Sequence, residues 1–468
     1  MLDDIGQAHV RYQHFYQGVP VFESEVIVHV NLRTAAVIDA TDALLSFGAL
    51  ATRPGLSAND ARGRALAHFG LAPGFSGRDD LMVLVNETGG WLTWRVRVGG
   101  DAAGGPVDSI AFVDALGGQV LRAWDNVETA TVVGTQNGTG FFNGVVDLTT
   151  DSLSGGNYRL KDPTRGSQFT CDMKNRQGPC YYMDDADNVW GNGALTNRQT
   201  VGVDAQYGTA QTWDYYKTVH GRNGIANNGA GAYNRVHYGN KYNNAYWSDS
   251  CLCMTYGDGD GVTFNPFDSL DVAGHEMSHG VTSRTANLTY SGESGGLNEG
   301  TSDIFGTMVE YYAGNSSDTP DYLIGEKLYK SAGGKALRYM YRPSIDGKSA
   351  DCWYATVGSL NVHYSSGVAN HFYYLLAEGT AATALNPASP TCVGADTRVA
   401  NGSASLAGIG RAAAEKIWYR ALTVYMTSSS NYAAARDATH RAAADLTGSL
   451  GANFTANVDN AWSAVNVH

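Results

Sequence analysis

Two histidines separated by three residues, in the stretch 272–281, constrain this chain of 468 residues more than any other feature. At about 100° per residue, an α-helix would place His275 and His279 one turn apart on the same face, the spacing at which two imidazoles bind one zinc ion. Glu276 follows next around the helix, so its carboxylate can lie beside the metal as a general base without binding it. A helix that merely carries two histidines is the competing interpretation.

A zinc site of this kind needs a third protein ligand, with the fourth position left for water. Downstream of His279, Glu299 and Asp303 are four residues apart and would share one face of a helix. We expect Glu299 to bind the metal. We expect Asp303 to accept a hydrogen bond from the far nitrogen of a ligating histidine.

Composition narrows the possible classes of protein. Hydrophobic residues make up 43% of the chain, charged residues 16%, and the formal net charge is −13. The negative charge argues against a nucleic-acid or anionic-membrane surface, and no apolar run approaches the roughly 20 residues of a membrane span. Residues 1–6 do not resemble a signal peptide, so a secreted protein would have its true beginning outside this sequence.

The six cysteines lie in three local groups, although six cysteines allow fifteen pairings. Proximity favours three disulfides, as expected for a secreted protein. The pairs are Cys171–Cys180, Cys251–Cys253 and Cys352–Cys392.

Residues 1–129 are expected to form a separate small α+β unit. Alternating apolar residues predict strands over 26–32, 91–98 and 110–115. A helix is expected over 58–67, with Ser57 as its N-cap.

Beyond residue 130 the chain changes from β-rich to α-rich. Short alternating segments and turn signals run from 130 to 200, followed by a helix over 203–219 and a strand over 235–238. After the helix expected around His275 and His279, called the zinc helix below, helical patterns predominate. They run over 299–312, 368–377, 409–426, 432–446 and 458–465. The candidate site lies at the junction of these two parts, a common location for a cleft.

Several ordered segments resemble the thermolysin-like zinc endopeptidases from about residue 130 to the end. They are 243–247 (NNAYW), 256–261 (YGDGDG), the zinc helix, Tyr290, 298–303 (NEGTSD), 337–339 (LRY) and 362–367 (VHYSSG). Residues 14–22 (HFYQGVPVF) are similar to the propeptide of that family. The resemblance implies an α+β fold with a propeptide (1–129), a β-rich lobe ending in the zinc helix (130–283) and an α-helical lobe (284–468).

The resemblance also implies roles for individual residues. His275, His279 and Glu299 would hold one zinc ion, Glu276 would be the general base, and Tyr290 and His363 would stabilise the oxyanion. Asn298 and Asp303 would support the zinc ligands from behind. Substrate would contact the backbone-pairing residues Asn244 and Ala245, the carbonyl-binding Arg338, and an apolar pocket of Phe264, Val272, Ile324 and Leu337.

One departure from the family pattern lies just upstream of His363. Family members place an aspartate there to orient the histidine, whereas the two candidate positions hold Gly358 and Asn361. Asn361 can orient a neutral imidazole but does not stabilise its charged form as a carboxylate does. We expect His363 to have a lower apparent pKa than in aspartate-bearing relatives.

The resemblance implies a structural calcium site as well, because oxygen-only ligation suits that ion. Its ligands would be four acids: Asp271, Glu310, Asp321 and Glu326. Leu323 stands where members with a double site have an acid, so a single ion is expected there.

These features favour a secreted, monomeric, neutral zinc metalloendopeptidase that cleaves before bulky hydrophobic residues. It would be made as a self-processing zymogen, cut between Glu128 and Val133, with peptides and its own propeptide as partners. The alternative is a secreted, metal-stabilised binding protein on a peptidase scaffold. Complete zinc ligands and Glu276 weigh against that alternative, since a binding module needs no base.

Overall fold

The structure is a computed structural model and describes residues 7–71, 79–86, 88–102, 105–125, 130–153, 156–331 and 335–468. The chain divides into two compact units. The first comprises Met1–Thr131 and Ser152–Gly156, and the second comprises Val132–Asp151 and Asn157–His468. None of the helices in the described ranges is long and apolar enough to cross a membrane.

The first unit is built on a seven-stranded sheet in the order β1-β2-β4-β5-β6-β7, with β3 paired to β2. Its strands are β1 (Gln7–Tyr16), β2 (Val19–Asn31), β3 (Val37–Ala43), β4 (Asp79–Asn86), β5 (Gly89–Ala102), β6 (Gly105–Asp114) and β7 (Val120–Asp125). The strand expected over 91–98 falls within β5, and those expected over 26–32 and 110–115 match β2 and β6 except for one residue at the end of each, as an α+β fold requires.

One helix, α1 (Ala58–His68), packs on this sheet. The Ser57 hydroxyl accepts a hydrogen bond from the Asp60 backbone N–H at 3.2 Å, so the expected N-cap is present. Ala61 and Ala65 are fully buried against the sheet, where they pack with Val96 and the other apolar residues of that cluster.

The second unit contains a larger sheet in the order β13-β14-β18-β20-β19, with β15 paired to β14. Its strands are β13 (Lys161–Asp162), β14 (Gln168–Arg176), β15 (Tyr181–Tyr182), β18 (Tyr233–Tyr238), β19 (Ala245–Ser248) and β20 (Cys253–Tyr256). Strand β18 runs parallel to β14 and β20, whereas β19 pairs antiparallel with β20 and forms the edge. An edge strand leaves backbone groups available to an added strand.

The remaining strands of the β-rich part are short. They are β8 (Ala130–Val133), β9 (Gly138–Thr139), β10 (Val145–Val146), β11 (Thr149–Ser152), β12 (Tyr158–Arg159), β16 (Asp184–Asp185), β17 (Trp190–Gly191), β21 (Leu323–Ile324) and β22 (Arg338–Tyr339).

Helices dominate the rest of the second unit. They are α2 (Arg198–His220), α3 (Leu270–Ser283), α4 (Gly292–Ala313), α5 (Val362–Ser365), α6 (Gly367–Ala377), α7 (Arg411–Arg420), α8 (Tyr432–Asp445), α9 (Thr447–Leu450) and α10 (Thr455–Ser463). The helix expected over 409–426 is wrong in detail: α7 begins at Arg411 and widens into a π-helical segment at Ala421–Tyr425. Gly410, with φ of 84°, cannot join the helix at its start.

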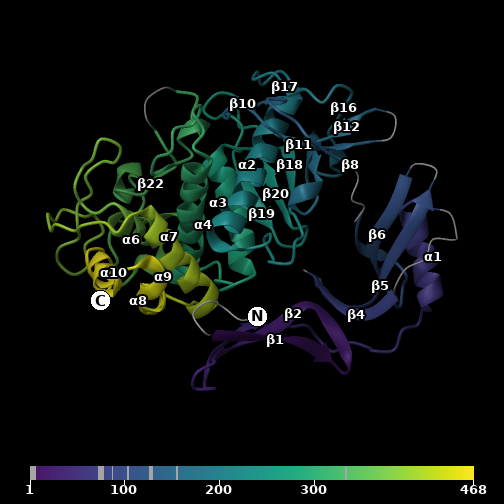
Figure 1. Cartoon of the computed structure of the whole chain (residues 1–468), viewed down its shortest axis with the longest axis horizontal. Helices are drawn as coiled ribbons and strands as arrows, with labels where there is room; N and C mark the ends of the chain where they lie inside the picture. Colours follow the sequence, from purple (N-terminus) through teal and green to yellow (C-terminus); the bar gives the residue numbers. More distant parts are fainter. Residues whose placement is uncertain are drawn as a thin grey trace. The chain divides into compact units, whose positions relative to one another are not determined.

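The zinc helix α3 lies beside α4 in Figure 1, and the two are in extensive contact. A Cβ built on Gly274 would lie 3.0 Å from Gly306 Cα, and one on Gly306 would lie 2.5 Å from the Asp271 carbonyl oxygen. Any larger side chain at these two crossing points would force the helices apart. The close approach therefore depends on glycine in both helices.

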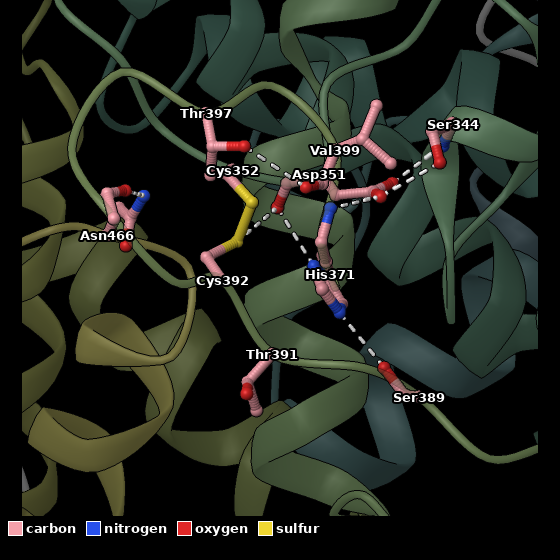
Figure 2. Close-up of a disulfide and its surroundings, with 12 residues drawn as sticks. Ser344, Asp351, Cys352, His371, Ser389, Thr391, Cys392, Thr397, Val399 and Asn466 are labelled. Carbon is pink, nitrogen blue, oxygen red and sulfur yellow. Dashed lines mark hydrogen bonds between the residues drawn. A yellow bond between two sulfur atoms is a disulfide. The ribbon is translucent and has the colours of Figure 1, made fainter. Parts of the chain in front are cut away.

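The structure forms the three disulfides expected from proximity. Figure 2 shows the one that spans the longest segment, Cys352–Cys392. Beside it, the Asp351 carboxylate accepts hydrogen bonds from the Ser344 backbone and hydroxyl at 2.6 and 2.8 Å. The buried His371 ring lies between the Asp351 carbonyl, at 2.8 Å, and Ser389. The disulfide and the His371–Ser389 contact tie the irregular segment after α6 to the helical core.

Candidate active site

The two histidines of α3 and the glutamate of α4 converge on one point. Nε2 of His275 lies 3.0 Å from Nε2 of His279, as the one-turn spacing predicts. Each of these nitrogens lies 3.5 Å from a carboxylate oxygen of Glu299. Two imidazoles and one carboxylate therefore face a common centre.

The chemistry of this donor set fits zinc. The potential ligand atoms of the three side chains lie within 4.8 Å of one another, and imidazole nitrogen with carboxylate oxygen is a common catalytic zinc set. Glu299 is fully buried, and its Oε2 has no hydrogen-bond partner. An unpartnered buried carboxylate oxygen is costly unless a cation satisfies it, so this oxygen marks the expected position of a metal.

Both histidine rings are oriented by contacts on Nδ1, the nitrogen that faces away from the centre. Nδ1 of His275 lies 2.8 Å from Oδ1 of Asp303. Nδ1 of His279 lies 2.7 Å from Oδ1 of Asn298, whose amide nitrogen donates to the Leu288 carbonyl. Contacts on Nδ1 leave Nε2 of each ring facing the centre, which is the arrangement expected for histidine ligands.

Asp303 is also the centre of a second network. Arg338 donates to both of its oxygens, from Nε at 2.7 Å and from Nη2 at 2.6 Å. Asn370, on α6, donates from Nδ2 to Oδ2 at 2.8 Å. Burial disfavours the charged form of Asp303, but Arg338 and His275 outweigh it and hold the pKa of this carboxyl far below its usual range.

Burial dominates the titration of the central side chains. It raises the pKa of Glu276 to about 7, although His275 opposes the shift. It lowers the pKa of His279 to about 4. Glu299 is equally buried, but the imidazoles of His279 and His275 outweigh that cost and lower its pKa.

Tyr290 and His363 approach the same centre from two further segments. The Tyr290 hydroxyl donates to Oε1 of Glu299 and lies 3.4 Å from Nε2 of His363. Nδ1 of His363 lies 2.8 Å from Oδ1 of Asn361, which also accepts the His363 backbone N–H at 3.0 Å. Asn361 therefore lies in contact with the ring from one of the two expected positions, while Gly358 has no side chain to offer.

The three expected zinc ligands, Glu276, Tyr290 and His363 line one cavity of about 730 Å³. The cavity is also lined by most of the expected substrate residues: Asn244, Ala245, Val272, Ile324, Leu337 and Arg338. Phe264 is the exception. It pairs with Tyr329 in an isolated β-bridge and packs on Phe267, and Phe267 lines the cavity in its place.

A second cluster of acids lies where α4 ends. Glu310, Asp318 and Glu326 place carboxylate oxygens within 4.8 Å of one another. Asp321 adjoins the cluster, because its backbone N–H donates to Oε2 of Glu310 at 3.3 Å. Burial raises the pKa of Glu310 well above its usual value, and the neighbouring acids, Asp271 among them, add to this shift. The carboxylate of Asp271 accepts from Ser269 and Gly325, and that of Asp321 accepts from Leu323.

Asn370, Asp318 and the glycine pair at the helix crossing were not predicted from the sequence. Asn370 and Asp318 carry no spacing signal relative to the zinc helix. The paired glycines Gly274 and Gly306 could have been suspected only from glycine within helical patterns, because such positions often have a packing reason.

Three family models match the chain. Residues 135–283 match the catalytic domain of thermolysin metallopeptidase, and residues 286–467 match its alpha-helical domain. Residues 3–33 match the fungalysin/thermolysin propeptide motif.

Named proteases match this chain over nearly its whole length. A transglutaminase-activating metalloprotease from Streptomyces mobaraensis is 44% identical over 99% of this chain, which spans 60% of that relative's length. Thermolysin from Alicyclobacillus acidocaldarius is 33% identical over 100% of this chain and 84% of the relative. Among solved structures, a precursor of protealysin, a metalloproteinase from Serratia proteamaculans, matches 64% of this chain and 87% of its own, with 28% identity and a TM-score of 0.49.

Proposed function

Because the chain belongs to the thermolysin metallopeptidase family, we propose that it is a secreted zinc endopeptidase that cleaves peptide bonds before bulky hydrophobic residues. The observation that carries the proposal is the convergence of His275, His279 and Glu299 beside the buried carboxylate of Glu276. These three side chains would hold one zinc ion. A zinc ion there supplies Lewis-acid polarisation of a carbonyl and lowers the pKa of water.

Glu276 is the proposed general base. Its pKa of about 7 allows the carboxylate to accept a proton from the attacking water and to return it to the leaving amine near neutral pH. Glu276 is buried and lines the cavity, so its carboxylate faces the space where the substrate would bind.

Tyr290 and His363 are the proposed oxyanion donors. The Tyr290 hydroxyl oxygen and His363 Nε2 lie 3.4 Å apart, so both can reach one oxygen atom of the tetrahedral intermediate. Donors positioned in this way each contribute about 3–4 kcal/mol to transition-state stabilisation.

The substrate is proposed to bind as an added strand along β19. Because β19 is an edge strand, the backbone around Asn244 and Ala245 can pair with an extended peptide. Val272, Ile324 and Leu337 supply an apolar wall to the same cavity, which favours a bulky hydrophobic side chain. Arg338, fixed by Asp303, would bind the carbonyl of that substrate residue.

Residues 1–129 are proposed to be a propeptide that assists folding and blocks the cleft until self-processing. The peptidase would then be a monomer with a β-rich lobe (130–283) and an α-helical lobe (284–468). Cleavage is proposed between Glu128 and Val133; residues 126–129 lie outside the described residues. N-terminal sequencing of the secreted protein should find a start in that interval, and a start before residue 120 or beyond 150 would contradict it.

A single calcium ion is proposed at the acidic cluster, bound by Asp271, Glu310, Asp321 and Glu326. Glu310 is fully buried, and its Oε1 has no hydrogen-bond partner, which supports a cation there. Oxygen-only ligation by several carboxylates suits calcium better than zinc.

Hydrolysis of casein and of a furylacryloyl dipeptide tests the enzyme directly. Activity should be abolished by a zinc chelator, restored by zinc, and absent in a folded Glu276→Ala variant. Unchanged hydrolysis in Glu276→Ala would reject the mechanism. No hydrolysis by the processed, zinc-loaded protein would favour a binding protein on the same scaffold.

A further inference from the structure

The segment that follows α4 returns an acid to the end of that helix. Gly314 ends α4 with φ of 53°, a left-handed conformation that reverses the chain. Asn315 then holds the turn, because its side chain accepts from Ser317 N–H and donates to the Asn143 carbonyl. The Asp318 backbone N–H donates to the Asn315 carbonyl at 3.2 Å. The position of Asp318 is therefore set by the turn.

Asp318 is completely buried, although it is a charged residue in a connecting segment. Its Oδ1 lies 3.2 Å from Nζ of Lys327, and its Oδ2 has no hydrogen-bond partner. Glu310 Oε1 and Glu326 Oε2 are likewise buried without hydrogen-bond partners. Among the described residues, Lys327, which is partly exposed, is the one lysine or arginine in an ion pair with this cluster of five acids, so one cation faces several carboxylates.

We propose that Asp318 is itself a ligand of the calcium ion. This inference rests on the calcium site proposed above. Calcium binds oxygen at about 2.3–2.6 Å, so two ligands of one ion can lie up to about 5 Å apart. The carboxylate oxygens of Glu310, Asp318 and Glu326 lie within 4.8 Å of one another and meet that requirement.

Lys327 gives the proposal a distinctive consequence. Its ammonium pairs with Asp318 and donates to the Ser317 carbonyl at 3.3 Å, so it competes with a cation for the same carboxylate. If Asp318 binds calcium, removing its carboxylate weakens calcium binding, whereas removing the lysine charge strengthens it. If Asp318 serves only as the ion-pair partner of Lys327, Asp318→Asn removes one nearby charge but no ligand, so calcium affinity falls by much less than tenfold. Lys327→Gln strengthens binding in either case, because Lys327 also lies close to the charges of Glu310 and Glu326.

The test is calcium titration calorimetry on the full chain carrying Glu276→Ala, which prevents self-digestion, with thermal unfolding in calcium and in a calcium-selective chelator. Asp318→Asn should weaken calcium binding about tenfold or more and lower the midpoint of unfolding mainly in calcium. Lys327→Gln should strengthen calcium binding several-fold. Lys330→Gln, which removes an exposed lysine that donates to Gly261, is the matched control and should change neither.

Calcium affinity in Asp318→Asn within a few-fold of the wild type would overturn the proposal, as would a chain that binds no calcium at all. If Asp318→Asn does not fold because Lys327 is left unpaired, the double variant Asp318→Asn/Lys327→Gln decides, since it removes both charges of the pair: weaker calcium binding than in the wild type supports the ligand role, and equal binding overturns it. Titration with magnesium tests the specificity of the site for calcium, and equal affinity for both ions would also count against a calcium site. Calcium binding is measured apart from hydrolysis, so its failure is distinguishable from failure of the proposed peptidase activity.

Discussion

Arg338 and Asp303 form a buried two-point ion pair, in which Nε and Nη2 of the guanidinium donate to the two carboxylate oxygens at 2.7 and 2.6 Å. The same carboxylate accepts from Nδ1 of His275. One side chain on α4 therefore positions both a proposed zinc ligand and the proposed carbonyl-binding arginine. We therefore expect Asp303 to affect zinc binding and substrate binding together.

Asp303→Asn should impair both functions together. The amide cannot accept from His275 and Arg338 at once as the carboxylate does, and Arg338 is left as a buried, uncompensated charge. We expect zinc affinity to fall about 10–100-fold and the free energy of unfolding to fall by about 3–5 kcal/mol. Chelator competition and chemical denaturation measure the two effects. Wild-type zinc affinity in a destabilised variant would show that Asp303 has only a structural role.

Tyr290→Phe should lower kcat by about 10²–10³ with little change in zinc content, because it removes one oxyanion donor and keeps the ring. The Tyr290 side chain is half exposed, so folding should be unaffected. Tyr312→Phe changes an exposed tyrosine on α4 outside the cavity and is the control. Equal kcat for the wild type and Tyr290→Phe would remove Tyr290 from the mechanism.

Asn361→Asp should extend activity to higher pH. The Asn361 contact with Nδ1 leaves Nε2 of His363 able to donate only when the ring is protonated, so activity falls as pH rises through the His363 pKa. Burial lowers that pKa in the wild type. A carboxylate at this position would favour the charged ring and move the alkaline limb of the pH–rate profile upward by about one unit. An unchanged limb would exclude His363 as the titrating group.

Gly306→Ala should separate α3 from α4. The new Cβ would lie 2.5 Å from the Asp271 carbonyl and 3.1 Å from the His275 backbone nitrogen. We expect a loss of about 1–3 kcal/mol in unfolding free energy together with weaker zinc binding, because Glu299 and the two histidines lie on the two displaced helices. Gly448→Ala is the control, since its Cβ would meet nothing within 4 Å. Unchanged zinc binding in Gly306→Ala would show that the helix crossing tolerates the methyl group.

Local periodicity determined much of the site from the sequence alone. The one-turn spacing of His275 and His279, and of Glu299 and Asp303, follows from helix geometry once each helix forms. The resemblance to the family then named most of the residues that line the cavity. The three disulfide pairs followed from the proximity of the cysteines along the chain.

Only the tertiary structure decided what depends on contacts between distant segments. The short separation of α3 and α4 depends on the contact between Gly274 and Gly306. No pattern within either helix predicts that separation. Phe264 has the right chemistry for the pocket but packs elsewhere, because its backbone bridges to Tyr329. Asp318 joins the acidic cluster because the chain reverses at Gly314, a result of loop geometry that residue spacing along a helix does not predict.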